Sequence, residues 1–255
     1  MVKKIVLILV EGNDEELILT PIIDALNETV SSKLNVKFKI QSDTVLTSNA
    51  RNQDPMTIVT NTVKKYMEFN ALKAKDILGV FKCIDLDGIF MKETDFEIDD
   101  TVKGFEYDVS NQKIKASKSE AQHMLNLWHV KLIKVQKLCR DNATLKINGT
   151  NIPFWLHFNN IMLERIINYA HKDELWRQDT EWKQNITQAF IELYSRAEAK
   201  GITPFKFALN YFDQYTYETT STYNALRYVE AHPWAPVSTW SFMLNELEQI
   251  IKPAS

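Results

Sequence analysis

The segment KIVLILVEGNDEELIL, from Lys4 to Leu19, decides the fold of this 255-residue chain. Residues 5–10 are all apolar and predict a buried strand, and the apolar spacing from Asp14 to Leu26 predicts a helix. Glu11 stands where the strand ends. Three more acidic residues follow in the first turn of the helix: Asp14, Glu15 and Glu16. Acidic residues there favour the helix dipole, or they form a site at the end of the strand.

The same alternation continues to about residue 90. A half-exposed strand is predicted from Asn35, a helix from Asp54-Pro55 to about Phe69, and a strand from Ile77 to Ile84. Strand and helix in alternation predict an α/β fold with a mostly parallel sheet covered by helices.

The later sequence predicts different elements. A hairpin is expected from Phe105 to Ala116, a long helix from Ser119, and one more strand from Pro153. Beyond Asn160 the pattern is helical and rich in aromatic residues. We therefore expect an α/β domain over residues 1–158, with the hairpin and a long basic helix at 105–140. A mainly helical region over 159–255 would pack on it.

Composition excludes several classes of protein. The net charge of −3 gives no overall attraction to nucleic acid, so such binding would need a local patch. The two cysteines are too few for a disulfide framework. The sequence shows no secretory signal and no run near the ~20 apolar residues of a membrane helix. We expect a cytoplasmic protein without membrane contact.

A second acidic motif resembles the first in its placement. Asp85 and Asp87 end the third predicted strand in CIDLDG, and if this strand neighbours the first, their carboxylates meet Glu11 at one edge. Such a cluster repels itself unless it is partly protonated or a cation neutralises it, and carboxylate oxygens suit Mg²⁺ or Mn²⁺. Gly12 and Gly88 follow the two acidic positions, where glycine lets a substrate backbone approach or permits a tight turn. Either motif alone is also explained as a helix start or a turn.

Together the two motifs resemble those of TOPRIM domains. ILVEGNDE resembles the first TOPRIM motif, a strand followed by Glu-Gly-x-x-Glu, and CIDLDG resembles the second, Asp-x-Asp. The resemblance covers about the first 90 residues. It implies that Glu11, Asp85 and Asp87 are catalytic, that these three and Glu15 bind Mg²⁺ or Mn²⁺, and that Glu11 acts as a general acid or base.

The layout is most similar to stand-alone TOPRIM nucleases of two-gene abortive-infection systems in phage defence, relatives of the OLD-type nucleases. That likeness implies nucleic acid as substrate and a separate ABC-type ATPase as partner. The chain carries no Gly-x-x-x-x-Gly-Lys loop of its own. Met162 stands where related nucleases have an acidic residue, and Glu164 is a candidate to replace it.

Two other functions fit parts of the sequence. CIDLDG also resembles the first motif of haloacid-dehalogenase-like phosphatases, with Asp85 as nucleophile and Asp87 as general acid. That family's second acidic pair would have to be Asp99-Asp100, which follow too soon to belong to another strand, and Glu11 would have no role. A non-catalytic TOPRIM-like interaction subunit, bound to its partner through the aromatic helical region, is the second alternative.

A basic stretch is the candidate nucleic-acid contact. Between Asn111 and Lys146 there are eight basic and two acidic residues. Lys131, Lys134 and Lys137 recur every three residues, so we expect them on one exposed helix face, opposite an apolar stripe. They would hold phosphates beside the carboxylates, although a lysine row is often only a solvated face. The choice of DNA or RNA, the trigger and the oligomeric state stay open.

Overall fold

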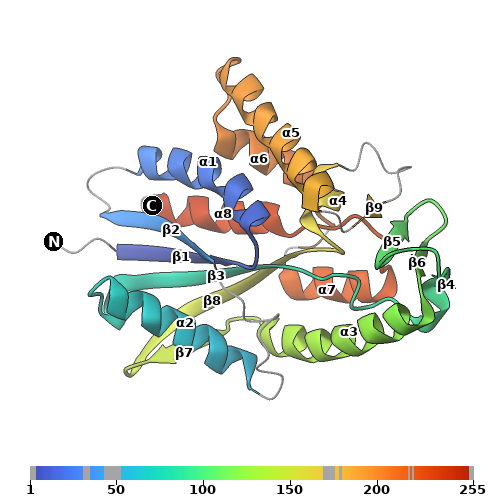
Figure 1. The fold of residues 1–255 in the computed structure, drawn as a ribbon. Helices are drawn as coiled ribbons and strands as arrows, with labels where there is room; N and C mark the ends of the chain where they lie inside the picture. The colour runs from blue at the N-terminus through green and yellow to red at the C-terminus, as the bar shows by residue number, and fades with distance from the viewer. Residues whose placement is uncertain are drawn as a thin grey trace.

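The computed structural model describes residues 4–30, 35–42, 53–168, 176–177, 180–217, 219 and 221–252. Its main sheet has five strands in the order β2-β1-β3-β8-β7 (Figure 1). These strands are β1 (Lys4–Val10), β2 (Val36–Ser42), β3 (Ile77–Asp85), β7 (Thr144–Ile147) and β8 (Thr150–Asn159). The first four in this order run parallel, and only β7 pairs antiparallel. The predicted α/β fold with a mostly parallel sheet is confirmed.

Helices cover both faces of the main sheet. They are α1 (Asn13–Thr29), α2 (Pro55–Phe69), α3 (Lys118–Leu138), α4 (Leu163–Ile167), α5 (Thr180–Glu198), α6 (Pro204–Asp213), α7 (Thr222–Ala231) and α8 (Trp240–Ile251), with the short 3-10 helices η1 (Ala74–Asp76) and η2 (Glu93–Asp95). Leu7 and Leu9 of β1 share one core with α2, α3 and α7. Val6 and Ile8 share the other core with α1, α4, α5, α6 and α8. Since β1 is buried on both faces, its apolar residues are continuous and do not alternate with polar ones.

Side-chain caps fix where two helices begin. Asp54 accepts a hydrogen bond from the Thr57 amide, and Pro55 occupies the first turn of α2, as the sequence predicts. Helix α3 begins earlier than expected, at Lys118, because the hydroxyl of Ser117 accepts a hydrogen bond from the amide of Glu120 at 3.2 Å.

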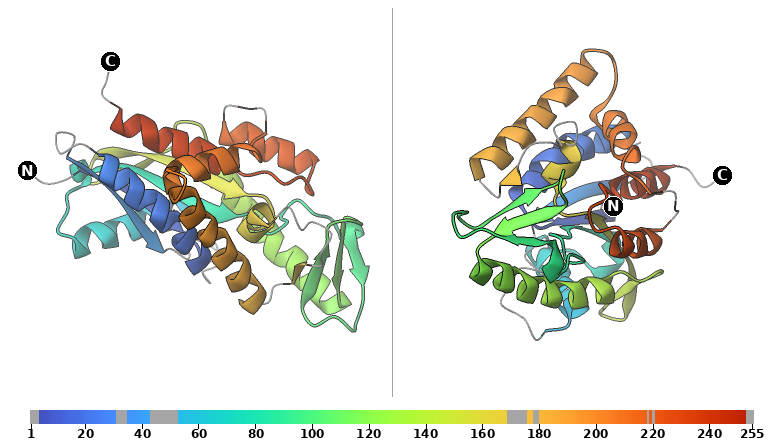
Figure 2. Two further views of the ribbon diagram at one scale, coloured as in Figure 1. Left: turned by 90° about the horizontal axis from the view of Figure 1, so that it is seen from above. Right: turned by 90° about the vertical axis from the view of Figure 1, so that its right-hand side faces the viewer.

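A second, smaller sheet lies beyond the carboxyl ends of the main strands (Figures 1 and 2). Its order is β4-β6-β5-β9, with β4 (Phe96–Ile98), β5 (Phe105–Asp108), β6 (Lys113–Ala116) and β9 (Trp176–Arg177). The antiparallel pairing of β5 with β6 confirms the predicted hairpin. A further hairpin, β7–β8, was not predicted; Asn148 and Gly149 at its turn both have positive φ, of 47° and 79°.

The aromatic residues after β8 are largely internal. Phe190 of α5 contacts Tyr211 and Phe212 of α6, with ring centroids 4.8 and 6.1 Å apart, and Phe212 contacts Trp240 of α8. Phe190, Phe212 and Trp240 are buried in the core that α1 and β1 also line. These three rings therefore form core and not surface, while a partner contact through other aromatic residues of this region stays a prediction, as does the boundary after residue 158. Among the described residues, no helix is long and apolar enough to cross a membrane.

Candidate functional site

The carboxyl ends of β1 and β3 bring the two acidic motifs together. The strands are parallel neighbours, Glu11 directly follows β1, and Asp85 is the last residue of β3. Asp85 also lies opposite Asn159, the last residue of β8. The sequence predicted that Glu11 and the Asp85 motif would meet at one sheet edge, and they do.

Asp85 accepts hydrogen bonds from two groups at and beyond the end of β8. Its carboxylate accepts hydrogen bonds from the Leu163 amide at 3.0 Å and from the Asn159 side chain at 3.2 Å. Burial, together with repulsion from Glu15, Glu164 and Asp87, raises the pKa of Asp85 well above its usual value, and the Leu163 amide only partly offsets this. Asp85 therefore joins the start of α4 to the end of β3.

Glu15 turns back from the first turn of α1 toward the strand end. Its residue is only 6% exposed, and a Cβ at Gly12 would lie 2.7 Å from its carboxylate, so glycine leaves room for this arrangement. Burial, with repulsion from Glu11 and Glu164, raises the pKa of Glu15 to about 7; its own backbone and Lys82 act in the opposite direction. The carboxyl group is poised to hold or release a proton near neutral pH.

Glu164 is a further acidic residue of this cluster, and it lies outside both sequence motifs. It lies in α4, is 3% exposed, and its Oε2 atom is buried without a hydrogen-bond partner within the described residues. Lys183 of α5 lies 3.6 Å from its other oxygen. Burial raises the pKa of Glu164, and Lys183 opposes that rise. Glu164, considered from the sequence only as a replacement for Met162, thus belongs to the cluster.

The expected exposed row of lysines is wrong for two of its three members. Lys131 and Lys134 are 8% and 4% exposed, whereas Lys137 is exposed. The buried face of α3 consists of Ala121, Met124, Trp128, Lys131, Lys134, Val135 and Leu138. Lys131 therefore lies in line with Met124 and Trp128. Of the expected apolar stripe, Trp128 and Val135 are on the buried face, and Leu125 and Leu132 are only partly buried.

Lys131 ends among the carboxylates. Its Nζ atom lies 2.5 Å from Oδ2 of Asp87 and 3.5 Å from Oε2 of Glu11. Burial opposes the charge, but Asp87 and Glu11 raise the pKa of Lys131 above its ordinary value, so it is a cation. The other oxygen of Glu11, Oε1, is buried and has no hydrogen-bond partner in the described part of the chain.

The loop after β3 is tied to the loop after β8. Asp87 and Gly88 have φ of 51° and 77°, and Ile161 has φ of 65°, which is rare for a β-branched residue. The Asp87 amide donates to the carbonyl of Ile161 at 2.6 Å, and the Tyr107 hydroxyl donates to the carbonyl of Asp87 at 3.4 Å. Two strained loops thus fix each other, and the small sheet supports them.

The carboxylate oxygens of this cluster are of the kind that bind a metal ion, but their arrangement does not hold one. The carboxylate oxygens are hard ligands, and the buried Oε1 of Glu11 lacks a partner in the described structure. Yet within the described residues no three Asp, Glu, His or Cys side chains are grouped so that they could hold one ion. Lys131 takes the place between Glu11 and Asp87 instead.

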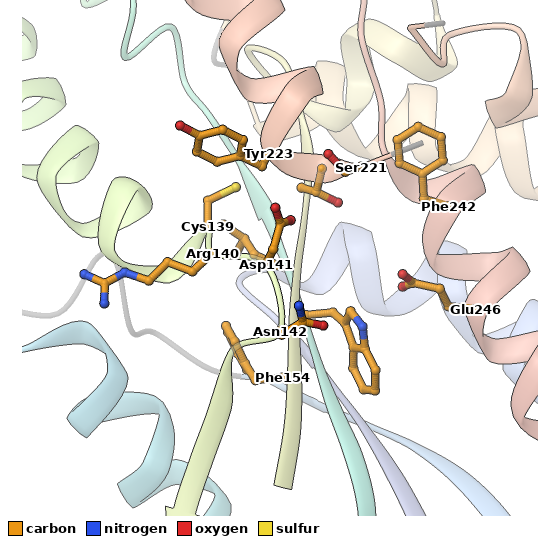
Figure 3. Close-up of a pocket in the computed structure, with 12 residues that line it drawn as sticks. Cys139, Arg140, Asp141, Asn142, Phe154, Ser221, Tyr223, Phe242 and Glu246 are labelled. Carbon is orange, nitrogen blue, oxygen red and sulfur yellow. The ribbon is translucent and has the colours of Figure 1, made fainter. Parts of the chain in front are cut away.

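A separate hollow of about 370 Å³ lies between the end of α3, β8, α7 and α8 (Figure 3). Asp141 and Glu246 turn toward it, and Arg140 points away. None of the clustered acidic residues lines it. Two carboxylates without a facing cation do not suit a phosphate ligand, so this hollow adds nothing to the site at the strand ends.

No protein-family model, no curated protein and no solved structure matches this chain. The site must therefore be interpreted from its own chemistry.

Proposed function

We propose that this chain is a metal-dependent phosphodiesterase, a nuclease of TOPRIM type. The observation that carries the proposal is the convergence of Glu11, Asp85 and Asp87 at neighbouring strand ends, with Glu15 and Glu164 buried beside them. Structural proteins rarely bury several carboxylates in one place, because each raises the cost of ionising the others. Functional sites tolerate that cost.

The residues divide into distinct roles. Glu11, Asp85 and Asp87 would bind Mg²⁺ or Mn²⁺, which when bound activates water and stabilises the leaving oxygen of a phosphodiester. Their present arrangement does not hold an ion, so a rearrangement must accompany binding. Glu15, with its pKa of about 7, is better suited than Glu11 to exchange a proton. Asp87, whose side chain is 37% exposed, is accessible to a substrate from solvent.

A cleavage assay tests this function. Purified protein is incubated with plasmid DNA and with total RNA, in Mg²⁺, Mn²⁺ or chelator. We expect metal-dependent cutting that Asp85→Asn abolishes. Asp24→Asn, an exposed carboxylate on the far part of α1, is the matched control and should cut normally. Equal cutting by both variants, or cutting in chelator, contradicts the proposal.

A non-catalytic interaction subunit is the second candidate. It is favoured by the ion pairs that Lys131 makes with two expected metal ligands, since the ammonium group offers these carboxylates a positive charge without any ion. An ABC-type ATPase would be the partner in either case, and co-expression followed by co-purification tests it. The phosphatase alternative is weaker: Asp99 and Asp100 follow β4 of the small sheet and do not end a strand of the main sheet.

A further inference from the structure

Lys131 breaks the pattern of the helix that carries it. It occupies a buried position of α3 between Trp128 and Val135, on a face whose other buried residues are apolar except for Lys134. A lysine at such a position is costly unless an opposite charge receives it. The side chains of Lys131 and Glu11 are each only 10% exposed, so this ion pair is largely desolvated.

The position of the ammonium group is that of a bound cation. It contacts Asp87 at 2.5 Å and Glu11 at 3.5 Å, and it therefore bridges the acidic motif after β1 and the one after β3. Asp85, Glu15 and Glu164 lie close enough to repel one another. Carboxylates at this spacing and burial remain ionised together only beside a positive charge, and without one they take up protons.

A divalent ion and the ammonium cannot both lie between Glu11 and Asp87. Carboxylate oxygens coordinate Mg²⁺ at 2.0–2.1 Å, so the oxygens must approach a common centre that Nζ now fills. In the part of the chain that the structure describes, no three such ligands are grouped so that they could hold one ion.

We propose that Lys131 is a tethered counter-ion that occupies the cation position of this cluster, so that a divalent ion binds only when the lysine side chain withdraws. The inference rests on the proposed metal-dependent function and adds a regulatory element to it. In the metal-free protein the ammonium group offsets part of the negative charge of Glu11 and Asp87. It also makes metal affinity lower than the carboxylates alone would give.

Calorimetric titration with Mn²⁺ tests the competition. Wild type is compared with Lys131→Gln, with Asp85→Asn, and with Lys137→Gln as the matched control, an exposed lysine on the same helix. We expect Lys131→Gln to bind Mn²⁺ with a Kd at least about tenfold lower than wild type, which corresponds to about 1.4 kcal/mol. Lys137→Gln should match wild type, and Asp85→Asn should not bind.

The outcomes separate the two proposals. Equal Kd values for wild type and Lys131→Gln, with binding lost in Asp85→Asn, overturn the counter-ion but leave the metal function standing. No binding by any variant overturns both.

A labelling experiment on wild type avoids the risk that Lys131→Gln folds poorly. An amine-acetylating reagent is applied with and without saturating Mn²⁺, and mass spectrometry measures modification at each lysine. Lys131 should be protected without metal and labelled at least about tenfold faster with it, as the side chain moves from a buried to an open position. Lys137 should be labelled equally in both. Continued protection of Lys131 in the Mn²⁺-bound protein contradicts the withdrawal.

Discussion

At the scale of single residues, Glu15 shows how the carboxylate cluster lowers the stability of the folded protein. Its carboxyl group is withdrawn from water and faces Glu11 and Glu164, so the ionised form is disfavoured. The pKa is about 7 in the folded protein, against an ordinary value of 4.5. Between these two pH values the folded chain holds a proton that the unfolded chain has released. The contribution of Glu15 to the free energy of unfolding is therefore fully present below pH 4.5 and is lost as the pH rises through about 7.

The variant Glu15→Gln should remove this pH dependence. In chelator, we expect it to be more stable than wild type by roughly 1–3 kcal/mol at pH 8 and to show little difference at pH 4.5. Urea unfolding at several pH values measures the difference. Glu28→Gln, an exposed residue of the same helix, is the control and should follow wild type throughout. A constant gap between Glu15→Gln and wild type would contradict the argument.

At the scale of elements, the alignment of β3 with β8 places the site. Asp85 meets Asn159 because the two strands are in register, and a close approach lies beside the first residue pairs of this register. A Cβ at Gly79 would lie 2.6 Å from the Trp155 ring, which stacks on Phe81 with centroids 4.5 Å apart. Glycine is required here for contact between strands and not for a turn.

We therefore expect Gly79→Ala to destabilise the protein by about 1–3 kcal/mol, because the added methyl group must displace a packed ring. Thermal or urea unfolding measures the loss. In a Trp155→Leu background, the same substitution should cost much less, since the obstructing ring atoms are gone. An equal cost in both backgrounds would show that the contact is not the cause.

Local patterns allowed many elements to be predicted, and long-range contacts account for the errors. The helix from Asp54-Pro55 and the strands around Glu11 and Asp85 have strong periodicity and end signals, and they form where expected. The environment of Lys131 could not be predicted from local patterns, because its partners Asp87 and Glu11 lie 44 and 120 positions away in the chain. A lysine at buried spacing between Trp128 and Val135 was the available signal.

At the scale of the whole molecule, metal binding should appear as stability. An ion that binds only the folded chain adds about 2.7 kcal/mol at a concentration of 100 times its Kd. For a chain of 255 residues this corresponds to a rise in Tm of roughly 5–10 °C. Scanning calorimetry with Mn²⁺ should show that rise for wild type and none for Asp85→Asn. A similar rise in Asp85→Asn would place the ion elsewhere.

The central position of β1 in the main sheet has a consequence for synthesis. Ile5 pairs with Lys37 of β2 on one side and with Ile77 of β3 on the other. One edge of β1 therefore has no partner strand until β3 has been synthesised. At about 5–20 residues per second, the ribosome takes roughly 4–15 s to reach it. During that time a segment without charge or proline between residues 5 and 10 is exposed, the kind of sequence that self-associates. A lower level of expression, which keeps fewer unfinished chains present together, should therefore increase the recovery of folded protein.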